Sequence, residues 1–229
     1  MSLVAQTSNQ PLIVWDWIGR NLTNIWDRTV EHIVLTVIAV GIGVLISAGL
    51  SLIALRWRRS YSPITWVAGL LYTIPSLALF TFFVPFTGLS VLTAEIGLVS
   101  YTLLILVRNM VTGIVEVPSE VLEAADAMGY SRRGRFLRIE LPLALPVIIT
   151  GIRLATVTII GLVTITSLIG LGGLGYFINR GLQTFSSPIG TTQIFVGTVL
   201  SIALAVTADL SLVGVERILT PWRTRRIGR

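Results

Sequence analysis

The sequence contains no cysteine and no lysine, and its single histidine is His32. The absence of cysteine excludes disulfide frameworks, zinc knuckles and thiol nucleophiles. One histidine is too few for a multi-histidine metal site or a histidine relay. All 17 basic residues are arginines, so the chain cannot form a Walker A loop or a Schiff base, which both need a lysine. We therefore expect no catalytic residue, no metal and no bound cofactor in this chain.

Charged residues are also scarce, at 12% of the chain, whereas 53% of the residues are hydrophobic and the mean hydropathy is +0.84. Soluble domains have about 25% charged residues. The composition therefore predicts an all-α integral membrane protein. The net charge of +6 could indicate nucleic-acid binding in a soluble protein. Here the arginines lie between apolar runs, where they set the orientation in a lipid membrane, so we expect no nucleic-acid partner.

The apolar runs predict about five membrane spans, because roughly 20 apolar residues cross a bilayer as a helix. A charge-free stretch from Ser60 to Ala94 is too long for one helix, and the turn-like sequence at 85–88 divides it. The expected spans are Ile33–Leu55, Ile64–Val84, Val91–Val107, Pro146–Ile169 and Thr191–Val215.

The distribution of arginines predicts the orientation of these spans. With the N-terminus outside the cell, the outer segments carry Arg20, Arg28 and Arg180, and Arg153 lies within the fourth span. The other thirteen arginines then lie on the inner side, in 56–59, at 108, in the 109–140 loop and in the C-terminal segment. This excess indicates an N-terminus outside and a C-terminus in the cytoplasm of a plasma-membrane protein.

The N-terminal segment has apolar residues at helical spacing between Leu12 and Arg28. We interpret it as an amphipathic helix on the outer surface within an external arm of residues 1–30; a frayed arm is the alternative. Residues 221–229 form a basic cytoplasmic tail. Glu95 is expected at the outer membrane edge as an interfacial residue.

The cytoplasmic loop between spans three and four contains the most specific pattern. Ser119 is a good helix N-cap, and Gly129 is suited to end that helix in the left-handed conformation. Ser131 predicts a second N-cap, and Pro142 is expected to stop the second short helix. These two helices could bind a soluble partner; the alternative is that they lie on the lipid headgroups.

This loop resembles the EAA motif of the membrane subunits of type I ABC importers. The resemblance is carried by Glu123-Ala124-Ala125, then Gly129, then the Ile139–Pro142 segment. Over residues 31–220 the chain is most similar to glycine betaine and osmoprotectant permeases, through the 72–78, 107–109 and 170–175 segments. Two residues depart from that pattern: Asp126 stands where a basic residue is common, and Ile105 where a proline is common.

The resemblance implies a transmembrane domain over 31–220 that imports glycine betaine, choline or carnitine by alternating access. It implies a second permease copy or a paralogous permease, an external substrate-binding protein, and two ATPase subunits that hold ATP and magnesium. A coupling helix would bind the ATPase. The residues expected to serve this coupling are Leu122, Glu123, Ala124, Ala125, Met128, Gly129 and Arg132.

Three further groups of residues are candidates for the transport pathway or its support. Pro75 should bend the second span, and pathway-lining residues are expected at Tyr72, Pro75 and Ser76. Gly172 and Gly173 are expected near an outer gate. Arg153 and Asp209 lie at similar depth and could form an intramembrane ion pair or each reach the interface separately.

Other classes of protein fit the sequence less well. An intramembrane serine protease would need a buried serine–histidine pair, and an aspartyl protease would need two buried aspartates. A passive channel or scaffold would not need the coupling loop. Within transporters, an importer of an amino acid such as methionine is the alternative.

Overall fold

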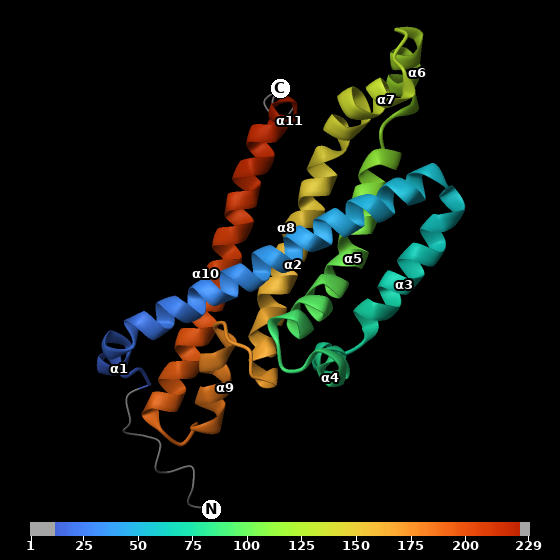
Figure 1. Ribbon diagram of the computed structural model, residues 1–229. Coiled ribbons are helices and arrows are strands. Elements are labelled where there is room, and N and C mark those ends of the chain that lie inside the picture. The colour runs from blue at the N-terminus through green and yellow to red at the C-terminus, as the bar shows by residue number, and fades with distance from the viewer. Residues whose placement is uncertain (1–11, 225–229) are drawn as a thin grey trace, which may run out of the picture.

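The computed structural model describes residues 12–224, and this part of the chain is helical, without strands (Figure 1). Long helices follow from the apolar sequence, because a backbone in lipid must satisfy its hydrogen bonds internally. The helices are α1 (Trp15–Arg20), α2 (Leu22–Arg56), α3 (Tyr61–Thr73), α4 (Ser76–Thr87), α5 (Val91–Val115), α6 (Ser119–Ala127), α7 (Arg132–Arg135), α8 (Leu141–Thr166), α9 (Gly175–Gln183), α10 (Pro188–Leu219) and α11 (Pro221–Thr224).

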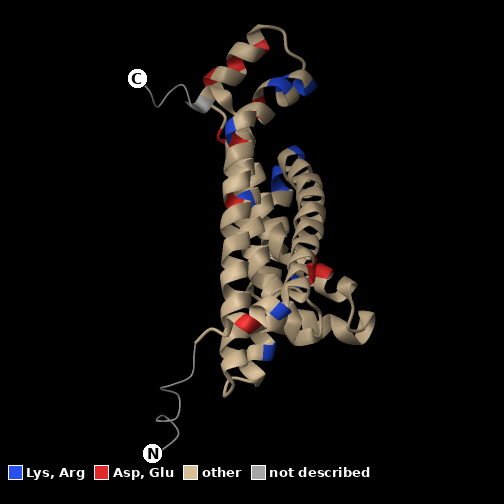
Figure 2. Cartoon of the chain, turned by 90° about the vertical axis from the view of Figure 1, so that its left-hand side faces the viewer, with Lys and Arg blue, Asp and Glu red and all other residues tan. Residues whose placement is uncertain are grey.

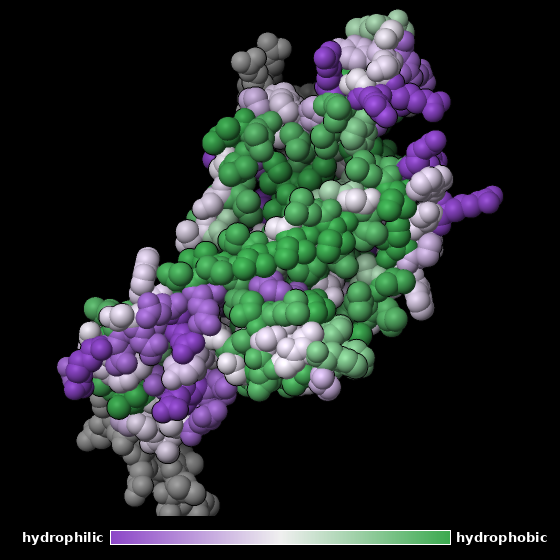
Figure 3. Space-filling view, viewed as in Figure 1, coloured by the Kyte–Doolittle hydropathy of each residue, from purple (hydrophilic) through white to green (hydrophobic). Residues whose placement is uncertain are grey.

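Within the described residues, four helices are long and apolar enough to cross a membrane: Leu22–Arg56, Val91–Val115, Arg132–Ile169 and Pro188–Leu219. They contain the first, third, fourth and fifth expected spans. A fifth span exists only if α3 and α4 are counted together. Figure 3 shows the matching surface, with a broad hydrophobic band between hydrophilic ends. The chain is therefore a multi-pass membrane protein.

The expected second span, Ile64–Val84, is divided between α3 and α4, which are bent by 96° relative to each other. Ile74 is extended, with φ −67° and ψ 130°, just before Pro75. A proline disfavours the helical conformation of the preceding residue, so the helix ends there and restarts at Ser76. The predicted bend at Pro75 is confirmed, and it is a complete break.

The expectation that Pro142 stops the helix is wrong. A π-helical segment, Phe136–Glu140, joins α7 to α8, so helix continues from Arg132 to Ile169. The Leu141 N–H donates to the Phe136 carbonyl, five residues back. Pro142 lies within this continuous run, directly after the π-helical segment, whose different hydrogen-bond pattern accommodates the proline.

The N-terminal segment is divided differently from the expectation. α1 covers only Trp15–Arg20, and after Asn21 the long helix α2 begins at Leu22. The boundary expected at residue 30 therefore lies inside α2. Residues 1–11 of the expected arm and 225–229 of the expected tail are outside the described residues.

Helices α2, α5 and α8 form the centre of the bundle, and α4 packs against them. Leu35 and Ala39 of α2, Leu98 of α5 and Ile159 of α8 belong to one buried apolar cluster with Phe80 of α4. α10 instead leaves most of its apolar side chains exposed. In Figure 1, α6, α7 and α11 lie at one end of the molecule, and α1, α4 and α9 lie at the other.

Candidate functional site

The end of the molecule that carries α6 and α7, here called the tip (residues 118–140), contains the expected coupling residues. Ser119 is not the N-cap: it is the first helical residue, and the Pro118 carbonyl accepts the N–H groups of Val121 and Leu122. α6 ends at Ala127, and Met128 follows as its C-cap. Pro118 occupies the cap because its extended backbone places its carbonyl at the helix start.

The turn that follows α6 has the predicted chemistry. Gly129 has φ +79°, and the backbone N–H groups of Gly129 and Tyr130 donate to Asp126 and Ala125 carbonyls at 3.0 and 3.2 Å. This is the Schellman pattern of a helix C-terminus, in which a glycine takes the left-handed position. Ser131 accepts a 3.2 Å bond from the Gly134 N–H. Both predictions, for Gly129 and for Ser131, are confirmed.

Burial divides the expected coupling residues into two groups. Ala125 is completely buried and Leu122 partly buried, so they hold α6 against the rest of the tip. The exposed members are Glu123, Ala124, Met128, Gly129 and Arg132. The small side chain of Ala124 beside the carboxylate of Glu123 leaves an accessible helix face that another protein can approach closely.

The tip carries charges of opposite sign on its two helices (Figure 2). Acidic residues lie along α6, and basic residues lie along α7 and the π-helical segment. Arg135 contacts two carboxylates: its Nη1 lies 2.5 Å from Asp126 Oδ2 and its Nε lies 2.9 Å from Glu140 Oε1. Asp126, which stands where the related permeases commonly have a basic residue, therefore pairs with an arginine of this same chain.

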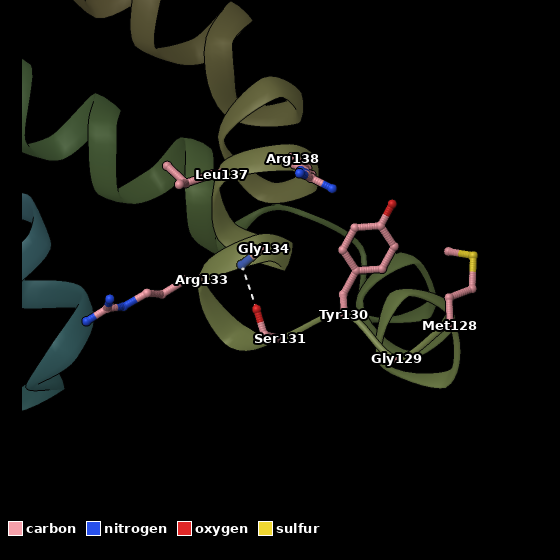
Figure 4. Close-up of a pocket in the computed structure, with 8 residues that line it drawn as sticks. All are labelled: Met128, Gly129, Tyr130, Ser131, Arg133, Gly134, Leu137 and Arg138. Atoms are coloured by element: carbon pink, nitrogen blue, oxygen red, sulfur yellow. Dashed lines mark hydrogen bonds between the residues drawn. The ribbon is translucent and has the colours of Figure 1, made fainter.

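An open hollow of ≈ 480 Å³ lies between the α6–α7 turn and the start of the long helix (Figure 4). Its lining includes Met128, Tyr130, Arg133 and Arg138. In Figure 4 the Tyr130 and Met128 side chains lie on the same side of the α6–α7 turn, and Arg133 points away from them. The residues that line the hollow include no pair of catalytic groups.

A second group of predicted residues surrounds the break between α3 and α4. Tyr72 and Pro75 are exposed and Ser76 is partly buried. The Tyr101 hydroxyl donates a hydrogen bond to the Ile74 carbonyl, which the break has freed from the helix. Tyr101 also packs edge-on against Tyr72, with 5.7 Å between ring centroids. Sequence reasoning did not identify Tyr101 as the support of this bend.

The predicted outer glycines lie in the loop between α8 and α9 and are buried. Glu31 of α2 accepts a 3.0 Å hydrogen bond from the Gly173 N–H, and an added Cβ on Gly172 would lie 1.8 Å from the same carboxylate. Arg28 pairs with Glu31 at 2.9 Å and stacks over the Tyr176 ring at 4.3 Å. We call Arg28, Glu31 and His32 the loop clamp.

His32 completes the loop clamp from a fully buried position. Its Nδ1 accepts the Leu174 N–H at 3.2 Å, so its Nε2 is the nitrogen that carries hydrogen and donates to the Ile160 carbonyl at 3.0 Å. The sequence prediction missed this role of His32. The sequence did contain a signal for this contact: Glu31 and His32 are adjacent polar residues at the start of a long apolar run, and the chain has a glycine-rich loop at 170–175 whose N–H groups need acceptors.

The structure brings Arg153 and Asp209 together from α8 and α10. Arg153 donates two hydrogen bonds to the Asp209 carboxylate, of 2.8 and 2.9 Å. Glu216, which was not predicted, lies 3.5 Å from the same guanidinium. Two carboxylates of α10 therefore share the one arginine of α8. The bidentate geometry of the Arg153–Asp209 pair fixes the position of α8 relative to α10.

Glu95 is buried within the bundle, whereas the sequence predicted an interfacial residue at the outer membrane edge. Its exposed fraction is 6%, and neither carboxylate oxygen has a hydrogen-bond partner among the described residues. It lies on the first turns of α5, next to Ala94 of the apolar cluster. This burial depends on which helices cover that face of α5, and the sequence pattern of α5 alone does not show it.

Comparison with known proteins shows which family the chain belongs to. Residues 39–220 match the family model described as the inner membrane component of binding-protein-dependent transport systems. The chain is 36% identical over 200 residues to the choline transport system permease protein OpuBB of Bacillus subtilis, covering 87% of this chain and 90% of that protein. It is 34% identical over 198 residues to the osmoprotectant import permease protein OsmW of Salmonella typhimurium, covering 84% and 90%.

Solved structures have the same fold. The inward-facing MetNI methionine ABC transporter matches with a TM-score of 0.71 and 20% identity, covering 86% of this chain and 96% of that one. A second crystal form of MetNI matches with a TM-score of 0.72 and 19% identity, covering 91% and 100%. The helical arrangement, the tip and the sequence similarity over most of the length agree: this chain belongs to the family of inner membrane components of binding-protein-dependent transport systems.

Proposed function

We propose that this chain is the permease subunit of an ATP-driven importer that takes up a small trimethylammonium osmoprotectant, such as glycine betaine, choline or carnitine. The similarity to OpuBB and OsmW over most of both chains carries this proposal. A further relative of Bacillus subtilis, at 34% identity over 194 residues, is named for glycine betaine, carnitine and choline transport. The likeness to the methionine transporter, at 20% identity, concerns the fold and does not favour methionine as the solute.

We further propose that the tip lies in the cytoplasm, with the N-terminus outside and the C-terminus inside. The excess of arginines in the inner segments supports this orientation. The turn between α2 and α3, which contains Arg58 and Arg59, lies at the same end of the molecule as α7 (Figure 1). The end of the molecule that carries α9 would then face the external substrate-binding protein.

The ATP chemistry belongs to partner subunits in this proposal. Two ATPase subunits, with ATP and magnesium, would act on a pair of permeases formed by two copies of this chain or by this chain and a paralogue. The exposed face of α6 at Glu123 and Ala124 would lie in a groove of the ATPase, and the absence of lysine is consistent with this division of labour.

Movement would pass from the tip into the membrane along continuous helix. α7, the π-helical segment and α8 form one helical run from Arg132 to Ile169, and Arg153 joins α8 to α10 through Asp209. Displacement of α6 on closure of the ATPase would therefore move α8 and α10 together. Such rigid-body motion of packed helices can exchange access between the two sides of the membrane.

Uptake by proteoliposomes tests this function. The permease is reconstituted with its ATPase and binding protein, and the vesicles are offered labelled glycine betaine, choline, carnitine and methionine. We expect ATP-dependent accumulation of at least one trimethylammonium compound and none of methionine. Vesicles whose ATPase lacks its Walker A lysine are the control. Accumulation of methionine alone, or uptake that continues without ATP hydrolysis, would refute the proposal.

Labelling tests the orientation separately. The natural absence of cysteine allows single-cysteine variants without further engineering. We expect an impermeant maleimide to reach Ala124→Cys only from the cytoplasmic face and Leu182→Cys, on α9, only from outside. The opposite pattern would reverse the proposed topology.

A further inference from the structure

We propose that Arg135 is a positioning residue that braces α6 against α8, so that force applied to α6 moves α8 instead of bending the turn between them. The inference rests on the proposed function, because the force is supplied by the ATPase. It assigns to Arg135 a role within the permease and not in direct contact with the partner.

The contacts of Arg135 carry the proposal. The guanidinium lies between a carboxylate of α6 and a carboxylate of the π-helical segment, 2.5 Å from Asp126 and 2.9 Å from Glu140. The exposed fractions are 25% for the Arg135 side chain, 13% for Glu140 and 56% for Asp126. Arg135 is therefore anchored on the less exposed Glu140 and reaches out to the end of α6.

The backbone at this place needs a brace. Only residues 128–131 connect α6 to α7, and Gly129 among them has a positive φ. A short connection with a glycine can change its dihedral angles readily, as hinge residues do. The contact between Arg135 and Asp126 crosses this connection with a side-chain link that a bending motion would have to break.

The π-helical segment explains why Glu140 can serve as the anchor. Its backbone bonds run between residues five apart, as from Leu141 to Phe136. Residues five apart therefore lie close to one another along this segment, and Arg135 and Glu140 have that spacing. A regular α-helix would instead bring residues three or four apart together.

Neighbouring charged residues lack such contacts, which makes Arg135 distinct. Among the described residues, Arg133 and Arg138 form no ion pair, and neither do Glu120 and Glu123 of α6. Asp126 alone of the α6 acids pairs with the permease itself. Glu120 and Glu123 remain exposed for the ATPase, whereas Asp126 and Arg135 hold the helix that presents them.

Transport stoichiometry provides the first test. In the reconstituted importer, Arg135→Gln should bind the ATPase as the unmodified chain does but should import severalfold less solute per ATP hydrolysed. Asp126→Asn should give the same defect. Arg138→Gln is the matched control, since it removes a nearby arginine that has no ion pair, and it should keep the normal ratio.

Two results would overturn the proposal. An unchanged ratio in Arg135→Gln would mean that the brace carries no force. Loss of ATPase binding in Arg135→Gln, with normal binding in Asp126→Asn, would mean that Arg135 contacts the partner directly.

Covalent rescue separates a brace from general damage to the tip. In the double variant Asp126→Cys/Arg135→Cys, a short bifunctional thiol reagent should restore the solute-to-ATP ratio, because it replaces the ionic link by a covalent one. A monofunctional reagent of similar size should not restore it. Equal results with both reagents would contradict the brace.

A distance measurement tests the brace without transport, so failure of the proposed function is distinguishable from failure of this inference. Spin labels at Ala127 of α6 and Thr150 of α8, both exposed, should give a narrow distance distribution in the otherwise unmodified chain and in Arg138→Gln. The distribution should broaden in Arg135→Gln. Equal widths in all three proteins would refute the brace, whatever the solute.

Discussion

Gly172→Ala gives the most direct test of the loop clamp. An added Cβ would lie 1.8 Å from Glu31 Oε2 and 2.1 Å from its Cδ, so the carboxylate must move away. It would then lose its 3.0 Å hydrogen bond from the Gly173 N–H. Hydrogen bonds to charged groups contribute about 1.5–3 kcal/mol. Because 41% of the Glu31 side chain is exposed, water replaces part of the interaction, and we expect a loss near the lower end of that range.

Gly172→Ala also has a stabilising effect on the free energy of unfolding, and the loss caused by the clash must exceed it. Gly172 has no positive φ, and a glycine-to-alanine change at a compatible position stabilises by about 0.4–1 kcal/mol through the unfolded state. The net expected change is a loss of about 0.5–1 kcal/mol in the free energy of unfolding. In a Glu31→Ala background the obstructing carboxylate is absent, so the same substitution should stabilise by about 0.5 kcal/mol.

The assay is denaturant-induced unfolding of the detergent-solubilised protein, followed by tryptophan fluorescence, for the four proteins of this cycle. The expected result is a change of sign: Gly172→Ala destabilises the unmodified chain and stabilises the Glu31→Ala variant. Destabilisation of similar size in both backgrounds would show that the contact between Glu31 and the loop does not control the effect, and it would refute the reasoning.

Three further predictions concern the bend, the shared arginine and the tip. Tyr101→Phe removes the hydroxyl donor at the break between α3 and α4 and should lower the free energy of unfolding by about 1–2 kcal/mol; no change on denaturant unfolding would contradict this. Arg153→Gln should reduce stability more than Asp209→Asn, because the first removes the contacts of Arg153 with both Asp209 and Glu216, whereas the second keeps the contact with Glu216. Additive losses in the double variant would exclude coupling. Gly129→Val should destabilise the tip by about 1–2 kcal/mol, because residue 129 has a φ of +79°. It should also lower the solute-to-ATP ratio more than Gly129→Asn does, since asparagine tolerates a positive φ. Equal ratios in the two variants would count against backbone strain as the cause.

Much of the local structure could be predicted from the sequence. Gly129 and Ser131 have the predicted roles because helix caps depend on a few adjacent residues and their own backbone bonds. Pro142 shows where such local rules are insufficient, because the π-helical segment before it changes the hydrogen-bond pattern and lets the helix continue. The rule for proline concerns a regular helix, and it fails where the helix is irregular.

The sequence by itself determined the membrane-spanning character, the position of the tip in the chain and the family resemblance, since lipid requires long apolar helices and the motif within residues 123–142 is a local pattern. Only the tertiary structure decided which distant groups meet. Glu31 and Gly173 are 142 residues apart, and Arg153 and Asp209 are 56 residues apart, so their contacts depend on how the helices pack and cross. Packing between helices also buried Glu95, and it brought Arg135 to Asp126 of α6 while Arg135 pairs with Glu140 of its own helical run. The burial and pairing of a side chain depend on the neighbouring helices as well as on its own.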